Sequence, residues 1–290
     1  MKERKGIILA GGLGTRLYPA TAAVSKQLLP IYDKPTIYYA LSTLMLSQIR
    51  DIMVISTPKD LPHFKKLLED GGKLGLNINY AEQKEPKGLA EAYLIGEDFL
   101  NDSPSCLILG DNLFYGGGLS PLLVEANKQT KSTIFTYQVS EPSKYGILSL
   151  DKYDNPISVE EKPENPKSNL AITGLYFFDN KAPMIAKEVK PSYRGELEIT
   201  EIISNYINGN NLINKKLSRG IAWLDTGTAE TLFEASVFVS TIEKRTGLKI
   251  CCPEEIAWRN KWITDENLEQ LANIKIKSDY GKYLLNILKG

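Results

Sequence analysis

The chain opens with Gly6-Ile-Ile-Leu-Ala-Gly-Gly-Leu-Gly-Thr-Arg-Leu17, and Ser25-Lys-Gln-Leu-Leu-Pro30 follows soon after. The apolar run Ile7–Ala10 predicts a buried strand, which leads directly into a loop with three glycines. Glycines let the backbone approach a ligand closely and direct several N–H groups at one anion. Arg16 and Lys26 add charged donors that match phosphate oxygens. This stretch therefore predicts a phosphate-binding site at the carboxyl end of a strand, where α/β folds place such sites.

The composition is that of a globular protein: the 290 residues are 42% hydrophobic and 24% charged. Lys plus Arg and Asp plus Glu number 35 each, so the net charge gives no support for binding a nucleic-acid polymer. No apolar run is long enough for a membrane-spanning helix or a signal-peptide core, so no membrane contact is expected. Cys106, Cys251 and Cys252 show neither metal-binding nor disulfide spacing, which favours a reducing, cytoplasmic compartment.

The only histidine is His63, in a turn-rich segment away from the other motifs. A Ser-His-Asp triad or a histidine-ligated zinc site would depend on this one residue. A position at the surface or at the start of a helix is the simpler interpretation.

Strands and helices alternate through the first half of the chain. Strands are predicted at 7–10, 51–56, 77–81 and 105–109, and helices at 35–47, 61–70 and 89–100. Continuous apolar runs such as 105–109 are typical of strands buried on both faces. The pattern predicts an α/β three-layer sandwich with a mostly parallel central sheet.

The second half is richer in strands. Strand candidates lie at 132–139, 146–150, 157–160 and 171–178, and helices at 198–207 and 228–244. After position 252 only short helices are predicted, at 253–262, 265–272 and 280–288. We therefore expect a core at 1–249, with halves at about 1–115 and 116–249, and a small helical appendage at 250–290.

The glycine loop does not match the common nucleotide-binding fingerprints. The G-x-G-x-x-G pattern of dinucleotide sites fails because position 17 is Leu17, and a P-loop would need a Gly-Lys-Ser/Thr sequence. A tight turn would explain the glycines alone. The adjoining Thr15-Arg-Leu17 and Ser25-Lys-Gln27 favour phosphate binding.

Two aspartates follow apolar stretches, in Leu107-Ile-Leu-Gly-Asp-Asn112 and Trp223-Leu-Asp-Thr-Gly-Thr228. Taken singly, Asp111 is also explained as a helix N-cap or turn residue. We expect Asp111 and Asp225 together at the sheet edge that carries the glycine loop. Because Mg²⁺ favours one or two carboxylates plus substrate phosphates, the pair predicts a magnesium site.

Two further motifs carry polar groups suited to a second substrate. In Val159-Glu-Glu-Lys-Pro163, Lys162 would hold a second phosphate and Glu161 would accept hydrogen bonds from sugar hydroxyls, whereas the alternative is a solvated ion pair. Gln83, followed by Gly88, is able to pair with a donor and an acceptor on a base edge. An exposed loop position is the alternative for Gln83.

Taken in order, these motifs resemble those of the glucose-1-phosphate thymidylyltransferases, sugar nucleotidyltransferases with a Rossmann-like, GT-A-type fold. The resemblance covers essentially the whole chain. It is carried by Leu9-Ala-Gly-Gly-Leu-Gly-Thr-Arg16, Ser25-Lys-Gln-Leu-Leu-Pro30, Tyr32-Asp-Lys-Pro35, Leu109-Gly-Asp-Asn-Leu113, Glu160-Glu-Lys-Pro163, Thr173-Gly-Leu-Tyr176, Arg194-Gly-Glu-Leu-Glu-Ile-Thr200, Trp223-Leu-Asp-Thr-Gly227 and Cys252-Pro-Glu-Glu-Ile256. Leu13 departs from the pattern, since many relatives carry Ser there, but its backbone N–H remains available.

The resemblance implies a nucleotide site in the first half. Its members would be Leu9, Gly11, Gly12, Gly14, Thr15, Arg16, Lys26, Gln27, Gln83, Gly88 and Asp111. The loop and Arg16 would hold the β- and γ-phosphates of dTTP, and Lys26 would contact phosphate. Gln27 would contact the deoxyribose, and Gln83 and Gly88 the thymine edge.

The second half would hold the sugar phosphate. The implied residues are Asn112, Tyr145, Gly146, Glu161, Lys162, Ile172, Thr173 and Glu196. Arg16, Lys162, Asp111 and Asp225 would carry catalysis, with Mg²⁺ on the two aspartates.

The implied reaction joins dTTP and α-D-glucose 1-phosphate to give dTDP-glucose and pyrophosphate, and it would feed dTDP-sugar synthesis such as that of dTDP-L-rhamnose. The sugar phosphate attacks the α-phosphorus in line and is already anionic, so no general base is needed.

A uridylyltransferase on the same fold is one alternative, because pocket discrimination of one methyl is worth only about 1–3 kcal/mol. A non-catalytic regulatory subunit that binds nucleotide sugars is another.

The helical tail carries Trp258 and Trp262 four positions apart, a spacing that ordinary packing also explains. The resemblance implies a homotetramer with a second, allosteric nucleotide site through which the dTDP-sugar end product inhibits.

Overall fold

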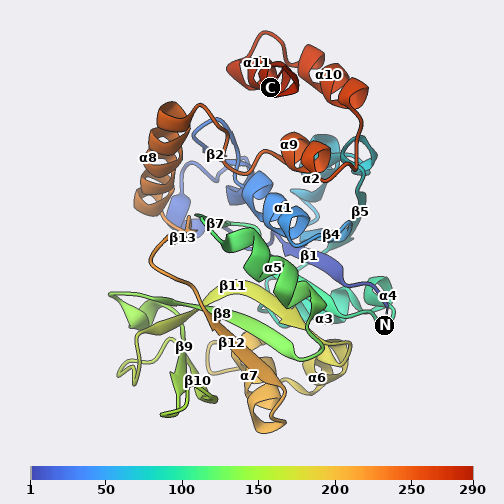
Figure 1. Ribbon diagram of the computed structural model, residues 1–290. Coiled ribbons are helices and arrows are strands. Elements are labelled where there is room, and N and C mark those ends of the chain that lie inside the picture. The colour runs from blue at the N-terminus through green and yellow to red at the C-terminus, as the bar shows by residue number, and fades with distance from the viewer. Residues whose placement is uncertain (1, 290) are drawn as a thin grey trace.

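Within residues 2–289, which the computed structural model describes, a nine-stranded mixed sheet forms the centre of the protein (Figure 1). Its first-half strands are parallel neighbours in the order β5 (Asn77–Glu82), β4 (Asp51–Ser56), β1 (Lys5–Leu9) and β6 (Ser105–Leu109). β1, β4 and β6 are buried along nearly their whole length, as their continuous apolar runs predict.

The second half extends the sheet mainly with antiparallel pairs. β11 (Leu170–Phe178) pairs antiparallel with β6 and with β8 (Ser132–Gln138), and β8 pairs in parallel with β12 (Leu212–Lys216). β9 (Gly146–Leu150) and β10 (Pro156–Glu161) form the far edge.

One edge of β11 is shared by two strands. β6 pairs with Leu175–Phe178, whereas β9 pairs with Leu170 and Ala171 at the other end. β8 occupies the opposite edge, where the register shifts between Ile172 and Tyr176. The sheet therefore opens between β6 and β9 at the middle of β11, which leaves room for a cavity beside the carboxyl end of β6.

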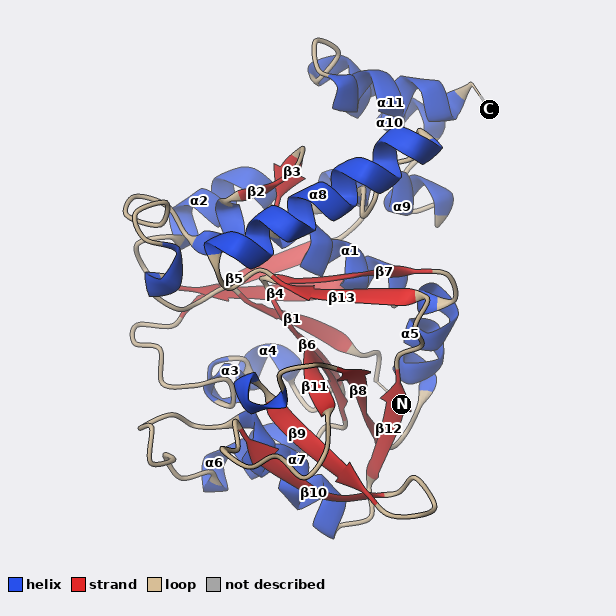
Figure 2. Ribbon diagram, turned by 90° about the vertical axis from the view of Figure 1, so that its left-hand side faces the viewer, coloured by secondary structure: helices blue, strands red, loops and turns tan. Residues whose placement is uncertain are grey.

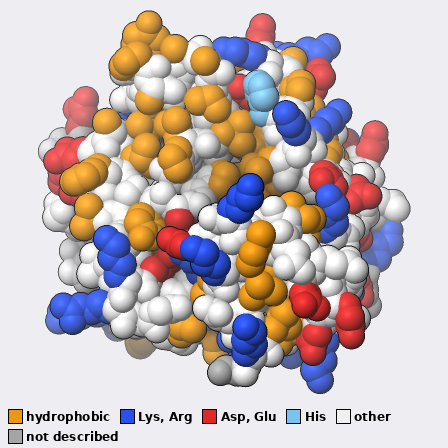
Figure 3. All heavy atoms as spheres, turned by 90° about the horizontal axis from the view of Figure 1, so that it is seen from above, with side chains coloured by type: hydrophobic (Ala, Val, Ile, Leu, Met, Phe, Trp, Pro, Cys, Tyr) orange, Lys and Arg blue, Asp and Glu red, His pale blue; other side chains and the backbone are white. Residues whose placement is uncertain are grey.

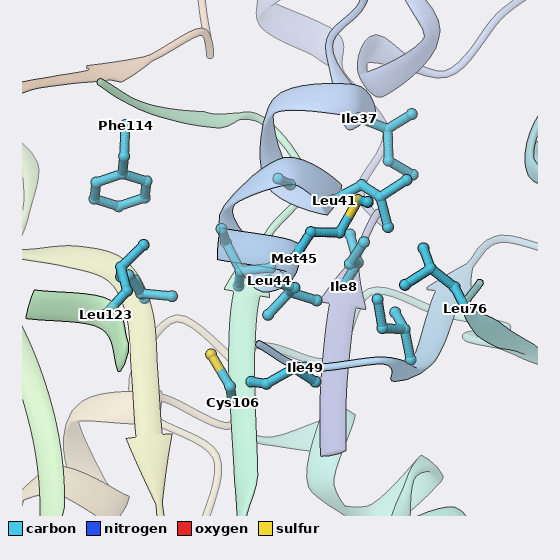
Figure 4. Close-up of a cluster of buried hydrophobic side chains, with 14 of the residues drawn as sticks. Ile8, Ile37, Leu41, Leu44, Met45, Ile49, Leu76, Cys106, Phe114 and Leu123 are labelled. Carbon is cyan, nitrogen blue, oxygen red and sulfur yellow. The ribbon is translucent and has the colours of Figure 1, made fainter. Parts of the chain in front are cut away.

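Helices cover both faces of the sheet (Figure 2). One face packs against α1 (Ile37–Leu46), α2 (Leu61–Leu68), α5 (Leu119–Lys128) and α9 (Pro253–Arg259). The other packs against α3 (Glu91–Ile95), α4 (Glu97–Leu100), α6 (Ala182–Glu188) and α7 (Ile199–Asn208). Figure 4 shows Leu41, Leu44 and Met45 of α1 packed over Ile8 of β1 and Cys106 of β6. The predicted three-layer α/β fold is confirmed.

Two small ribbons lie beside the main sheet. β7 (Asn112–Gly116) pairs antiparallel with β13 (Ile221–Asp225), and β2 (Pro30–Ile31) pairs with β3 (Lys34–Pro35). α8 (Ala229–Thr246) starts directly after β13, with the side chain of Thr228 capping its first turn. Its buried Glu243 pairs with Lys34 over 3.0 Å, which ties the helix to the β2–β3 ribbon.

The tail contains the three predicted helices, α9, α10 (Asp265–Ile274) and α11 (Asp279–Leu288). α9 packs against α1 and shares its hydrophobic core. The division of the chain at 249/250 stays a prediction. Among the helices of residues 2–289, none combines the length and apolar character that crossing a membrane requires.

Some elements differ from the sequence expectation. The predicted helix at 89–100 is two helices, α3 and α4, separated at Gly96, the residue with the lowest helix propensity after proline. The pattern also missed β2, β3, β7, β12, β13, α5 and α6. Short 3-10 helices occur at Thr15–Leu17, Lys26–Leu28, Gly72–Leu74 and Pro142–Lys144.

Arg4 offers a test of how the sheet is fixed at its amino-terminal side. Its buried guanidinium donates to the carbonyls of Ser105 at 2.7 Å and Phe178 at 2.6 Å, and also to those of Asn127 and Gln129. We expect Arg4→Met to lower the free energy of unfolding by about 2–4 kcal/mol, because buried carbonyls lose their donors. Urea denaturation measures this, with the exposed Lys128→Met as control. Equal stabilities of the two variants would contradict it.

Candidate active site

A cavity of about 640 Å³ lies at the carboxyl ends of β1 and β6, where the sheet opens. It is lined by residues from both halves of the chain. The predicted site residues in its wall are Leu9, Gly11, Gly12, Thr15, Arg16, Lys26, Gln27, Gln83, Gly88, Asp111, Asn112, Tyr145, Gly146, Glu161, Lys162, Ile172, Glu196 and Asp225.

Two predicted residues do not line this cavity. Gly14 has a φ of 60° and its carbonyl accepts a hydrogen bond from Thr21 at 2.8 Å, so it shapes the loop behind the wall. Thr173 is fully buried, and its hydroxyl donates to the carbonyl of Phe135 in β8 at 3.1 Å. Its side chain is therefore engaged with β8 and not with the cavity.

The glycine loop brings Arg16 beside the second aspartate. Gly12 and Gly14 take positive φ values of 95° and 60°, which lets the chain turn sharply after β1. A Cβ at Gly227 would lie 2.9 Å from Nη2 of Arg16 and 3.2 Å from Oδ1 of Asp225. The Arg16 guanidinium and the Asp225 carboxylate therefore both lie against the backbone of Gly227.

Asp111 lies two residues after the end of β6 and sits in a network of fixed partners. Lys26 forms an ion pair with its carboxylate. Asn112 donates to Oδ1 of Asp111 at 3.2 Å, and Trp223 donates to Oδ1 of Asn112 at 2.6 Å. These contacts leave the Asp111 carboxylate little rotational freedom.

Asp225 is positioned by a strand pair that was not predicted from the sequence. It was expected at the edge of the central sheet, but it ends β13 in the separate β7–β13 ribbon. The ribbon register pairs Asp225 with Asn112. In addition, the N–H and hydroxyl of Thr226 both donate to the carbonyl of Asp111, at 3.2 and 2.9 Å. The two aspartates are therefore brought together by backbone pairing.

The two carboxyls titrate differently. Burial, and then the charge of Asp111, raise the pKa of Asp225 to about 6, although Lys26 and Arg16 act in the opposite direction. Burial alone would also raise the pKa of Asp111, but the charge and hydrogen bond of Lys26 hold it below its usual range. The repulsion between the two groups marks this place as one where a further cation is stabilised.

The donor set fits a hard divalent ion that also binds phosphate. No group of three or more His, Cys, Asp or Glu side chains suited to a metal occurs in residues 2–289. Two carboxylates completed by substrate phosphates and water are a set that Mg²⁺ accepts, whereas structural zinc requires four protein ligands. The aspartate pair therefore suits a metal that arrives with a nucleotide.

The sugar side of the cavity contains an arginine that sequence reasoning did not select. Arg194 lines the cavity and pairs with Glu196 at 2.9 Å and with Glu161 and Glu198 at 3.4 Å each. Burial and the charge of Glu198 raise the pKa of Glu161. In the sequence, Arg194 is followed by Glu196 and Glu198. Surface ion pairs show the same pattern, so the sequence alone did not mark Arg194 as a site residue.

Lys162 follows the last residue of β10 in an unusual backbone conformation. Its φ is 41°, and its N–H donates to the carbonyl of Tyr145 at 3.1 Å. Its ammonium lies 3.7 Å from the carboxylate of Glu161 and its side chain is 42% exposed, so it remains accessible to an anionic ligand.

The only histidine takes no part in this site. His63 is exposed on α2 and is the pale blue side chain in Figure 3. This agrees with the expected surface position.

The cavity thus combines a glycine loop, two aspartates and cations from both halves of the chain. A family model described as "Nucleotidyl transferase" matches residues 5–242. The chain belongs to the nucleotidyl transferase family. The predicted resemblance to the glucose-1-phosphate thymidylyltransferases is also confirmed by individual relatives of this nucleotidyl transferase.

The glucose-1-phosphate thymidylyltransferase of Xanthomonas campestris pv. campestris is 54% identical over 290 residues, which covers 100% of this chain and 98% of the relative. That of Mycobacterium tuberculosis is 52% identical over 285 residues, covering 98% and 99%.

Solved structures are similar as well. The crystal structure of a putative glucose-1-phosphate thymidylyltransferase from Bacillus anthracis, in complex with a sucrose, has a TM-score of 0.75 at 37% identity and covers 81% of this chain and 94% of that one. UDP-glucose pyrophosphorylase complexed with UDP-glucose has a TM-score of 0.73 at 27% identity and covers 84% and 100%.

The raised pKa of Asp225 gives a prediction for the metal-free nucleotidyl transferase. With a folded-state pKa of about 6 against an ordinary 3.8, the folded protein favours the neutral carboxyl, so ionisation of Asp225 opposes folding above pH 6 and has no effect below about pH 4. We expect Asp225→Asn to raise the free energy of unfolding by about 1–2 kcal/mol at pH 7.5 and by less at pH 4.5.

Urea denaturation of the chelator-treated protein at the two pH values measures this effect. Asp98→Asn, at an exposed position of α4, is the control. A loss of stability at pH 7.5, or the same gain at both pH values, would show that the ionisation of Asp225 is not opposed by its surroundings.

Proposed function

We infer that the chain transfers the thymidylyl group of dTTP to α-D-glucose 1-phosphate and releases pyrophosphate, with dTDP-glucose as the other product. This inference depends on one observation: both halves of the chain contribute cationic side chains to the same cavity. Arg16 and Lys26 come from the first half, and Lys162 and Arg194 from the second. Two anionic substrates need two sets of cationic side chains. The relatives that match the whole chain at 52–54% identity support the same reaction.

In this reaction an oxygen of the sugar phosphate attacks the α-phosphorus of dTTP. A bond forms between that oxygen and phosphorus, the bond to the β-phosphate oxygen breaks, and pyrophosphate leaves with the electron pair. The nucleophile is already an anion, so the protein needs no general base. Its task is to bring two anions together and to stabilise charge on the leaving group.

On the nucleotide side, we propose that the glycine loop and Arg16 bind the β- and γ-phosphates. Lys26 would contact phosphate, and Gln27 would contact the deoxyribose. Gln27 is 1% exposed and its side-chain oxygen accepts from Ser25 at 2.6 Å, so its amide is fixed before the nucleotide arrives. Gln83 and Gly88 would bind the base edge.

On the sugar side, we propose that Lys162 holds and orients the attacking phosphate, with Arg194 beside it. Glu161 and Glu196 would accept hydrogen bonds from hexose hydroxyls, and Tyr145 and Gly146 would shape the pocket. Arg194 holds both glutamates in place in the unliganded protein, which reduces the ordering that binding requires.

Asp111 and Asp225 would hold Mg²⁺, which when bound neutralises charge on the phosphates. The like charge of the two carboxylates supports this assignment: burial, and then the charge of Asp111, raise the pKa of Asp225, and a cation would offset that charge. The ammonium of Lys26 now pairs with Asp111 and would be free to turn toward phosphate.

A cytoplasmic homotetramer with an allosteric nucleotide site is part of the same proposal. Cys106, Cys251 and Cys252 are free and buried, which is compatible with a reducing compartment. Phe233 and Val237, one turn apart on α8, are exposed apolar side chains suited to a subunit contact.

A pyrophosphate-release assay with glucose 1-phosphate and Mg²⁺ tests the function. We expect release with dTTP and slower release with UTP, which lacks the 5-methyl group and carries a 2′-hydroxyl; loss of the methyl group alone accounts for about 10- to 200-fold. Faster release with UTP would favour a uridylyltransferase, the activity of the structural neighbour at 27% identity. No release with either nucleotide would favour a non-catalytic binding protein.

Removal of either aspartate tests the metal assignment. We expect Asp111→Ala and Asp225→Ala each to lower turnover at least about a hundredfold, the cost of losing a major electrostatic contact. Turnover is measured across a Mg²⁺ titration, with the exposed Asp98→Ala as matched control. Near-normal turnover of both variants at limiting Mg²⁺ would contradict the assignment.

A further inference from the structure

Glu91, which does not line the cavity, contacts the residue assigned to the nucleotide base. Gln83 follows β5, is 4% exposed, and has its backbone N–H bonded to the carbonyl of Ser56 at 2.8 Å. Its side-chain Nε2 donates to Oε2 of Glu91, the first residue of α3, at 2.8 Å. The backbone and the side chain of Gln83 are therefore both fixed.

The carboxylate decides which way the Gln83 amide faces. A side-chain amide has a donor end and an acceptor end of nearly the same shape, so packing alone does not distinguish its two orientations. A carboxylate at neutral pH only accepts hydrogen bonds. Only Nε2 is able to face Glu91, and turning the amide over would place two acceptors against each other in a buried site.

The opposite end of the amide is left as a free acceptor in the cavity wall. Oε1 of Gln83 lies against Gly11, where any Cβ would collide with it. No hydrogen bond from residues 2–289 to this oxygen is found, although Gln83 lines the cavity. Oε1 is not among the buried polar atoms that lack a partner, so it is accessible from the cavity and is available to accept an N–H from a ligand.

Glu91 also fixes the loop that leads to Gly88. The N–H of Lys87 is shared: it donates to the carbonyl of Glu85 at 2.9 Å and to the same Oε2 of Glu91 at 3.3 Å. Oε2 thus accepts from both the amide and the loop, and both groups flank the part of the cavity assigned to the base. A substitution that keeps an oxygen at this point should keep both contacts.

We propose that Glu91 is a positioning residue that sets base specificity by fixing the Gln83 amide with its acceptor toward the base; this rests on the proposed function. Thymine and uracil present an N3–H donor, which an acceptor binds. N3 of cytosine carries no proton and is itself an acceptor, so it would face the acceptor Oε1 without a hydrogen bond between them. The site therefore selects thymine and uracil over cytosine through a residue that never touches the base.

The test compares kcat/KM for dTTP, dUTP and dCTP, with glucose 1-phosphate, in wild type and in Glu91→Ala. Without the carboxylate the Gln83 amide is free to turn and present Nε2 to cytosine. We expect the dTTP-to-dCTP ratio to fall at least about tenfold, the effect of one buried polar contact. The dTTP-to-dUTP ratio should stay unchanged, because it depends on the methyl group and not on the amide.

Glu91→Gln serves as the conservative variant, since its amide oxygen is able to accept from both Gln83 and Lys87. We expect it to keep the dTTP-to-dCTP ratio within about threefold of wild type. Glu97→Ala is the matched control, because it removes a partly exposed carboxylate of α4 that pairs with Lys187. Glu91→Met keeps the side-chain volume without an acceptor and replaces Glu91→Ala if that variant does not fold.

An equal loss of kcat/KM for all three nucleotides in Glu91→Ala, or an unchanged dTTP-to-dCTP ratio, would overturn the proposal. If wild type releases no pyrophosphate from any nucleotide, the proposed function fails by itself. The same ratios are then read from dissociation constants measured by calorimetry, with the same expected changes.

Discussion

Two carboxylates that repel each other, buried Asp111 and half-buried Asp225, lie in the wall of the cavity, and much of the surrounding structure serves to hold them there. Asp225 is aligned with Asn112 by the β7–β13 ribbon, and Thr226 donates twice to the carbonyl of Asp111. Backbone hydrogen bonds of this kind do not depend on side-chain rotamers, so they keep like charges close where flexible contacts would let them separate. Lys26 and Arg16 offset part of the repulsion, and a bound cation would offset more of it.

The space around these carboxylates follows from one irregularity of the sheet. β6 and β9 share an edge of β11, so the hydrogen-bonded surface is interrupted at residues 172–174. The first-half strands bring the glycine loop to one side of this gap, and β9 and β10 bring Gly146 and Glu161 to the other. A continuous sheet would offer the edge of the parallel strands as a single phosphate site. The opened sheet instead places cations from both halves of the chain around one cavity, which suits the proposed transfer between two phosphates.

The sequence was sufficient for the parts of the site that depend on local order. Asp111 lies two residues after the end of a buried apolar strand, and the glycines closely follow β1, so strand-end geometry predicted both. The sequence was insufficient where strand pairing between distant segments determines the position of a residue. Neither β7 nor β13 has a distinct pattern alone, and the position of Asp225 follows only from their register. Local sequence also does not distinguish the surroundings of Arg194 and Thr173. A charged residue near acids and a threonine in a strand look the same whether they face a ligand or a neighbouring strand.

No histidine or cysteine side chain lines the cavity in the described part of the chain. The proposed reaction does not require one. His63 is exposed near the start of α2 and does not line the cavity, and burial raises the pKa of the thiols of Cys251 and Cys106, which keeps them protonated. The attacking phosphate carries its own charge, so proton transfer would add nothing to its reactivity. The acidic side chains that remain are used to fix neighbours: Glu161 and Glu196 with Arg194, and Glu91 with the amide of Gln83. In a reaction governed by the placement of anions, a carboxylate that fixes the orientation of a partner contributes as directly as one that exchanges protons does elsewhere.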